Sequence, residues 1–360
     1  MSLQVGIIPF GEDTNPYQEL TRRALVAEGL QVSTFPKSNF LPLWRAARSG
    51  VAVLHSDWPH SFYRGANGLR SSIKRLAFRW QLLRLGRIRL VWTVHNLQTH
   101  NTGGNGDEEL RRYVARADAL VSLSEGGVEV IRQRWPEAAR KRIVTIPHGH
   151  YSDWYRTDIP QAEARRALGM PLGARIGALV GRLQPYKGIE ELVPSFSAVA
   201  GKNDWLIIAG APVNESYATH LRQLALSCPR IRFLPGWVAK PDLEQLLCAA
   251  DYAVFAFKEI FNSGSVILAM TFGLPVIATR RGTIPEVVPP YAWFDAGDGS
   301  EASLRTALGE AMRSGDLAES GRRVREHVLQ KHSWQVVGSR LKSLYEYLVC
   351  RGPASGLPMP

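Results

Sequence analysis

Two cations lie close together on one short segment, directly after an apolar run that is typical of a buried β-strand. In "ALVGRLQPYKGIEEL", Arg182 follows the strand, and Lys187 precedes Gly188 at the start of a predicted helix. A helix N-terminus offers free N–H groups and the positive end of the helix dipole to an anion. Two cations beside such an end suit a diphosphate. The alternative interpretation is a pair of solvated surface cations.

A turn of small polar residues precedes a strongly apolar helix further along the chain. The stretch "FNSGSVILAM" places Asn262, Ser263, Gly264 and Ser265 before that helix. Such a turn either caps the helix or lets a phosphate approach its backbone N–H groups. We expect it to form the second half of the diphosphate site. The segment "GTIPEVV" follows the next predicted strand, and it either closes the same pocket or is an ordinary turn.

Two strand ends in the first half of the chain carry groups that could move a proton. Asp57 lies in "LHSDWPHSF", and His95 lies in "VWTVHNLQTHN". Both are candidates for the general base of a group transfer, with Asp57 first and His95 second. Each could instead be structural, as a turn carboxylate or as a buried histidine with satisfied hydrogen bonds.

Strand-like and helix-like runs alternate regularly along the chain, and each of these segments directly follows a strand-like run. The alternation pauses at the polar stretch "YSDWYRTDIP" and then restarts. It predicts an α/β chain with two Rossmann-like, doubly wound domains that face each other across a cleft. We expect domains over 1–150 and 151–330, and a terminal helix over 331–350 that crosses back to the first domain. Ligands of such sheets bind at the carboxyl ends of the strands, where all the candidate residues lie.

Positive charge is concentrated in the first half of the chain. The net charge is +12, and the segment 58–106 contains eight Lys and Arg but no Asp or Glu. An uneven basic surface implies an anionic partner. The sequence has no helix-turn-helix, zinc-finger or RNA-recognition pattern that would indicate nucleic acid as this partner.

One helix of this basic segment resembles an amphipathic helix that lies on a membrane surface. Cations surround a set of apolar residues that recur at helical spacing: Ile73, Leu76, Ala77, Trp80 and Leu83. We expect the helix to face an anionic membrane or the acceptor, through Arg70, Lys74, Arg75, Arg79 and Trp80. The alternative is an ordinary helix whose apolar row faces the core.

Several classes of protein are disfavoured by what the sequence lacks. No run of about 18 apolar residues predicts a membrane-spanning helix, and the N-terminus reads as a first strand, not a signal peptide. The three cysteines have no metal or redox spacing, and the HxH pair His148 and His150 has no third ligand nearby, so we expect a cytoplasmic protein without a bound metal. The absence of GxGxxG after the first strand argues against a dinucleotide-dependent oxidoreductase.

The segments "GRLQPYKGIEEL", "FNSGSVILAMTFGLPVIA" and "GTIPEVV" resemble the nucleotide domain of GT-B glycosyltransferases of the family 4 kind. The resemblance is strongest over residues 178–290. It implies a nucleotide-sugar donor bound by the C-terminal domain, an acceptor bound by the N-terminal domain, and no catalytic metal. It also implies that Arg182 and Lys187 contact the donor diphosphate and that the turn at Gly264 and Ser265 supplies N–H groups.

A narrower resemblance is carried by "DWPHSF", "HGHYSDWY", "RLQPYKGIE" and "NSG". These segments are similar to the β-mannosyltransferases of xanthan-type exopolysaccharide assembly. The similarity implies GDP-mannose as donor, a polyprenyl-diphosphate-linked oligosaccharide as acceptor, and a peripheral position at the inner face of the cell membrane. Alternatives are a transferase that uses a UDP- or ADP-sugar and a non-catalytic nucleotide-sugar or phosphoglycan binding protein.

Leu268 is a departure from the family 4 pattern. It stands where that pattern has a glutamate that holds the donor ribose, directly before Ala269. Glu259 and Glu286 are the two candidates to replace this acid, and the sequence does not choose between them.

Overall fold

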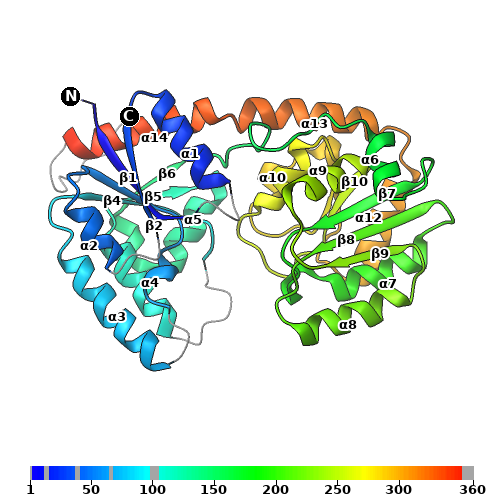
Figure 1. Ribbon diagram of the computed structural model, residues 1–360, viewed down its shortest axis with the longest axis horizontal. Helices are drawn as coiled ribbons and strands as arrows, with labels where there is room; N and C mark the ends of the chain where they lie inside the picture. Colours follow the sequence, from blue (N-terminus) through cyan, green and yellow to red (C-terminus); the bar gives the residue numbers. More distant parts are fainter. Residues whose placement is uncertain (1, 12–15, 37–40, 65–67, 98–104, 351–360) are drawn as a thin grey trace. The chain divides into compact units, whose positions relative to one another are not determined.

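The computed structural model describes residues 2–11, 16–36, 41–64, 68–97 and 105–350, and the chain divides into two units (Figure 1). The first unit comprises Met1–Gly149 with Ser333–Pro360, and the second comprises His150–His332. Each unit has one parallel, six-stranded sheet.

The strands of the first unit occur in the order β2-β1-β3-β4-β5-β6 across the sheet. The chain runs outward from β1 to β2 and then returns to the other side of β1 with β3, so the topological switch point lies between β1 and β3. The strands are β1 (Gln4–Phe10), β2 (Gln31–Pro36), β3 (Val53–Ser56), β4 (Arg89–Thr93), β5 (Ala119–Ser122) and β6 (Arg142–Thr145).

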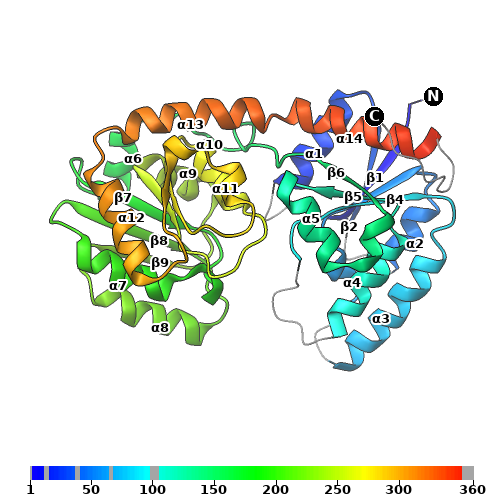
Figure 2. The same ribbon diagram turned by 180° about the vertical axis from the view of Figure 1, so that it is seen from behind.

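Helices cover both faces of this sheet, as right-handed crossovers require. One face carries α1 and α14, which pack against each other, and the other carries the remaining α-helices of the unit (Figures 1 and 2). The Lys342 ammonium donates to the backbone carbonyl of Glu28 at 2.8 Å, which joins α14 to the end of α1. The helices are α1 (Tyr17–Ala27), α2 (Pro42–Ala47), α3 (Gly68–Leu83), α4 (Asn105–Arg116), α5 (Glu125–Arg134) and α14 (Trp334–Cys350).

The second unit has the strand order β12-β11-β10-β7-β8-β9, with its switch point between β7 and β10. Its core is a continuous apolar cluster that includes Leu179, Phe196 and Val254. The strands are β7 (Arg175–Val180), β8 (Asp204–Gly210), β9 (Ile231–Pro235), β10 (Tyr252–Phe255), β11 (Val276–Ala278) and β12 (Trp293–Asp295).

The helices of the second unit also form two layers. In one layer α7 packs against α8 and α12; in the other α6 packs against α9, and α10 packs against α13 (Figure 2). The helices are α6 (Gln161–Ala167), α7 (Ile189–Val199), α8 (Glu215–Leu226), α9 (Lys240–Ala249), α10 (Gly264–Thr271), α11 (Ile284–Val287), α12 (Glu301–Arg313) and α13 (Leu317–Lys331).

Candidate functional site

Lys187 lies at the switch point of the second unit. It ends a short 3-10 turn (Pro185–Lys187), and Gly188 follows with a φ of 64° and caps α7. A Cβ on Gly188 would lie 2.0 Å from the Ala256 carbonyl oxygen, so only glycine permits this approach to the end of β10. The turn after β7 is thereby held against the loop after β10.

The Lys187 ammonium is buried beside the start of α10. A Cβ built on Gly181 would lie 3.2 Å from Lys187 Nζ and 3.5 Å from Ser265 Oγ, so the amine and the hydroxyl flank the same glycine. The Lys187 residue is only 5% exposed, and no ion pair of its ammonium is found among the described residues. Burial lowers the pKa of Lys187 to about 8.

The turn before α10 is both a helix cap and a junction between loops. The Ser263 hydroxyl accepts the N–H of Val266 at 3.3 Å, as an N-cap does. The Asn262 side-chain oxygen accepts the Thr283 hydroxyl at 3.1 Å, and the Thr283 N–H donates to the Phe261 carbonyl at 2.9 Å. Three loops of the second unit, after β7, β10 and β11, therefore meet at one edge of the sheet.

The remaining residues predicted for the donor lie on these same loops. Arg182 is exposed just beyond β7, Glu259 is exposed in the loop after β10, and Glu286 is exposed on α11. Leu268 is half-buried one helical turn after Gly264. It therefore presents an apolar side chain on the face of α10 that begins at the turn.

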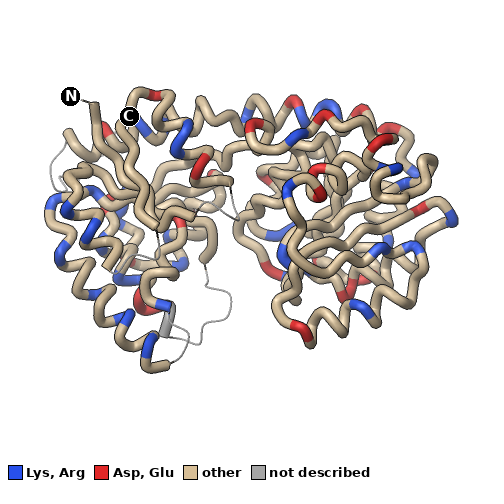
Figure 3. Tube along the Cα trace, viewed as in Figure 1, with Lys and Arg blue, Asp and Glu red and all other residues tan. Residues whose placement is uncertain are grey.

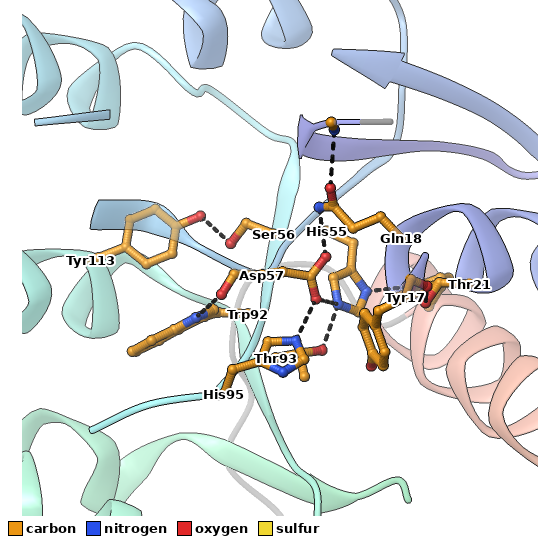
Figure 4. A network of polar contacts seen from close by, with 12 residues as sticks. Tyr17, Gln18, Thr21, His55, Ser56, Asp57, Trp92, Thr93, His95 and Tyr113 are labelled. Atoms are coloured by element: carbon orange, nitrogen blue, oxygen red, sulfur yellow. Dashed lines mark hydrogen bonds and ion pairs between the residues drawn. The ribbon is translucent and has the colours of Figure 1, made fainter. Parts of the chain in front are cut away.

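Asp57 and His95, the two candidates for a general base, are bonded to each other in the first unit (Figure 4). The His95 Nε2 atom lies 3.1 Å from Asp57 Oδ1, and the Gln18 amide donates to Asp57 Oδ2 at 2.8 Å. The Gly11 N–H donates to Gln18 Oε1 at 3.3 Å and so turns the amide NH₂ toward the carboxylate. The Trp92 indole N–H donates to the backbone carbonyl of Asp57 at 3.2 Å.

This network keeps the Asp57 carboxylate ionised. Burial raises the pKa of Asp57, but the hydrogen bond and electrostatic interaction with His95 and the hydrogen bond from Gln18 lower it, and the net result is a lowered pKa. An ionised carboxylate can only accept, so the N–H of His95 Nε2 donates to Asp57, and this bond fixes the orientation of the imidazole ring. Asp57 is 2% exposed and is committed to its partners, so it is suited to orient His95.

A second histidine of this network links the strand ends to the C-terminal helix. His55 Nε2 lies 2.7 Å from Thr93 Oγ1, and His55 Nδ1 is hydrogen-bonded to the Tyr345 hydroxyl of α14. Burial lowers the pKa of His55, so this ring is neutral near pH 7. It is a structural histidine of the kind that the sequence could not distinguish from a reactive one.

Aromatic rings surround His95. The Trp58 ring stacks on it with centroids 5.1 Å apart, and the Tyr17 ring meets it edge-on at 4.7 Å. The same Tyr17 ring lies 4.7 Å from that of His148. Sequence reasoning did not assign Tyr17 or Gln18. Their position in the first turn of α1, beside the switch point, was the available signal.

The row of large apolar side chains along the basic helix α3 does not face the core. Ile73, Leu76, Trp80 and Leu83 are exposed, so that alternative is wrong for this row. Arg70 and Lys74 are exposed, Arg75 is half-buried, and Arg79 bonds with both Nε and Nη2 to Glu109 Oε1, at 2.9 and 2.6 Å. Arg79 therefore fastens α3 to α4.

The described residues contain neither a cluster of metal ligands nor a membrane-spanning helix. No group of three or more His, Cys, Asp and Glu side chains within the described ranges could hold a metal ion. None of the helices that the structure describes is long and apolar enough to cross a membrane.

Comparisons with known proteins agree with this architecture. The model of the family "Glycosyl transferases group 1" matches residues 174–314, which contain the three loops after β7, β10 and β11. A GDP-mannose:glycolipid 4-beta-D-mannosyltransferase from Xanthomonas campestris is 27% identical over 311 residues, which is 82% of this chain and 80% of that protein.

A second relative has a slightly higher identity over a longer stretch and carries a different name. The D-inositol 3-phosphate glycosyltransferase of Corynebacterium jeikeium is 30% identical over 357 residues, which is 92% of this chain and 80% of that protein. Among solved structures, a sucrose-phosphate synthase from Thermosynechococcus elongatus has a TM-score of 0.76 at 19% identity and covers 97% of this chain and 100% of its own. The chain is thus a glycosyltransferase with the GT-B architecture and belongs to the group 1 glycosyltransferases.

Proposed function

We propose that this enzyme transfers mannose from GDP-mannose to a polyprenyl-diphosphate-linked oligosaccharide, or to another membrane glycan, in exopolysaccharide synthesis. The observation that supports the donor assignment is the buried Lys187 ammonium, which lies beside Gly181 near the Ser265 hydroxyl at the start of α10. A buried ammonium without an ion pair is unfavourable. The diphosphate of the donor would supply the missing anion.

The donor loops are suited to stabilise the leaving group. As the bond between C1 of the sugar and the β-phosphate oxygen breaks, negative charge grows on the nucleoside diphosphate. Lys187, Arg182 and the N–H groups at Gly264 and Ser265 are the groups of this chain that would oppose that charge. They could do so without a metal ion, and we propose that the reaction is metal-independent.

The first unit would supply the proton acceptor if the sugar is transferred with inversion. The acceptor hydroxyl oxygen attacks C1, and its proton passes to a base. We assign this role to His95 and an orienting role to Asp57, which reverses the order expected from the sequence. The reason is that Asp57 already accepts bonds from His95 and Gln18. In a retaining transfer the same pair would position the acceptor only.

The identity of donor and acceptor is supported by the mannosyltransferase from Xanthomonas, whose name gives GDP-mannose and a glycolipid. A nucleotide sugar from solution and a lipid-linked acceptor would meet at the cytoplasmic surface of the membrane, where we place the enzyme as a peripheral protein. The inositol-phosphate relative favours a second candidate, transfer to a small phosphorylated acceptor.

Thermal-shift measurements with GDP, UDP and ADP, followed by transfer assays, test the proposal. GDP should raise Tm most, and GDP-mannose should then label a lipid-linked acceptor. Stabilisation by UDP or ADP instead would reassign the donor. Labelling of inositol phosphate, but of no lipid-linked glycan, would favour the second candidate. Binding of GDP-mannose without transfer to any acceptor would favour a non-catalytic binding protein.

A further inference from the structure

The helix α3 has two opposite faces, and only one of them packs against the protein. Phe78, Gln81 and Leu82 are buried on the inner face. Five large apolar side chains lie on the outer face and are 38% to 84% exposed: Leu69, Ile73, Leu76, Trp80 and Leu83. Their spacing alternates between four and three residues, so they form one continuous row along the helix. We refer to these five residues as the apolar row.

Cations lie on both sides of the apolar row. Arg70, Lys74 and Arg84 are exposed, and Figure 3 shows the basic residues spread along the whole helix. No ion pair of Lys74 or Arg84 is found among the described residues. The segment 58–106 contains no acidic residue that could pair with them locally. The outer face therefore combines apolar side chains with the exposed positive charges of Lys74 and Arg84.

A second helix extends this face at one end of the row. The buried Gln81 side-chain oxygen accepts the N–H of Leu43 at 3.0 Å and so fixes the start of α2 beside α3. The Trp44 ring then lies 6.2 Å from that of Trp80, and the guanidinium of Arg84 lies 5.5 Å from the Trp80 ring. Tryptophan flanked by cations is typical of side chains at the level of lipid headgroups.

Two partners would suit a row with this spacing, and the charges decide between them. A second copy of α3 could pair with the row as in a coiled coil. Such pairing would bring Lys74 and Arg84 of both copies together, and the acids that α4 places beside α3, Glu108 and Glu109, are already paired with Arg79 and Arg112. An anionic lipid surface accepts the cations at its phosphates and the apolar row among its acyl chains. A groove of about 330 Å³ beside the row, lined by Ser72, Arg75, Leu76, Arg79 and Glu108, adds donors at that level.

We propose that the outer face of α3 docks on an anionic bilayer, with the apolar row inserted between the lipids and Lys74 and Arg84 at the phosphates. Arg79 is excluded from this role because it holds Glu109. The reason why the enzyme would dock on a membrane rests on the proposed function, because a lipid-linked acceptor is found only there. The contact itself is argued from α3 and α2 alone.

Co-sedimentation of the full chain with vesicles tests the docking. Vesicles of phosphatidylcholine with 40% phosphatidylglycerol, a composition we choose, should bind the protein, and pure phosphatidylcholine should bind it at least ten-fold more weakly. The variant Leu69→Ser/Leu76→Ser/Leu83→Ser should lose at least ten-fold in binding. The matched control Leu172→Ser/Leu226→Ser, on exposed leucines of the second unit, should bind as the wild type does.

Three outcomes would overturn the proposal. They are equal binding to both vesicles, unchanged binding of the triple variant with a native circular-dichroism spectrum, and a wild-type dimer that the triple variant converts to a monomer. A transfer assay with a short-chain, water-soluble acceptor separates this proposal from the proposed function. Transfer to the soluble acceptor without binding to vesicles would contradict the docking proposal alone. Binding to vesicles without transfer to any acceptor would contradict the proposed function alone.

Discussion

At the scale of one residue, the buried charge of Lys187 lowers the stability of the free protein, and we propose that it binds the donor diphosphate. A pKa held near 8 instead of 10.5 corresponds to a cost on the order of 3 kcal/mol in the free protein. Lys187→Met keeps the length of the side chain and removes the charge. We expect it to raise Tm by several degrees at pH 7 and to abolish GDP binding, as measured by calorimetry.

The pH dependence of this gain follows from the same pKa. Below pH 8 the folded protein holds a charged, buried amine, whereas above pH 8 the amine is neutral and the cost fades up to pH 10.5. The Tm advantage of Lys187→Met should therefore shrink as pH rises from 8 to 10. Lys202→Met, at an exposed site of the second unit, is the control and should change neither property. A lower Tm for Lys187→Met at pH 7 would contradict this account of the site.

Asp57 gives a second prediction at this scale. Asp57→Asn keeps the shape of the side chain but removes the charge that orients His95. We expect kcat to fall by about 10² to 10⁴ while the Kd for GDP stays unchanged, because the donor residues lie in the other unit. Asp118→Asn removes a carboxylate that accepts the Leu90 N–H elsewhere in the first unit, and it should leave kcat near the wild-type value. Equal losses in both variants would assign Asp57 a purely structural role.

The place of a residue in the fold, as distinct from its role, was predictable where the residue directly follows a strand. Arg182, Lys187 and Ser265 follow central strands, so the βα rhythm alone placed them on one edge of a sheet. The bond between Gln18 and Asp57 was not predictable, because it joins residues 39 positions apart through side-chain geometry. The choice between Asp57 and His95 as base likewise depended on burial, which a sequence does not state.

At the scale of the element, α3 contains cations with two different tasks. Arg79 neutralises the fully buried Glu109 side chain, whereas Lys74 is exposed. Arg79→Ala leaves a buried carboxylate unpaired and should cost about 3 kcal/mol of unfolding free energy. Lys74→Ala should change stability by less than about 0.5 kcal/mol and should weaken binding to anionic vesicles. Urea denaturation beside co-sedimentation measures both effects, and similar stability losses in the two variants would contradict the distinction.

The elements themselves show why α3 was ambiguous in the sequence. Its apolar row has the period of a core-facing stripe, and a helix of this kind usually buries such a stripe. In the structure Phe78 and Leu82 provide the buried face and leave the row outside. Only the docking of α3 onto the sheet and α4, which depends on contacts with distant segments, decides which face turns inward.

At the scale of the whole molecule, the chain divides its chemistry between two sheets built on the same plan. Each sheet places its candidate residues at the switch point, between β1 and β3 in the first unit and between β7 and β10 in the second. The first unit holds the hydrogen-bonded pair Asp57 and His95, which we propose for proton transfer, and the second holds Arg182 and Lys187. A transferase that must deprotonate one substrate and stabilise the leaving group of the other needs both kinds of site.

Hydrogen exchange of the whole chain tests this division. GDP at 100 times its Kd, with EDTA present, should slow exchange by up to about 100-fold in peptides that cover 181–188, 262–266 and 283–287. Peptides that cover 53–58 and 92–95 should exchange as in the free protein, because the proton-transfer pair belongs to the other unit. Protection that appears only after Mg²⁺ is added would contradict the metal-independent mechanism. Protection confined to the first unit would contradict the proposed donor site, because GDP would then bind there and not at the buried ammonium of Lys187.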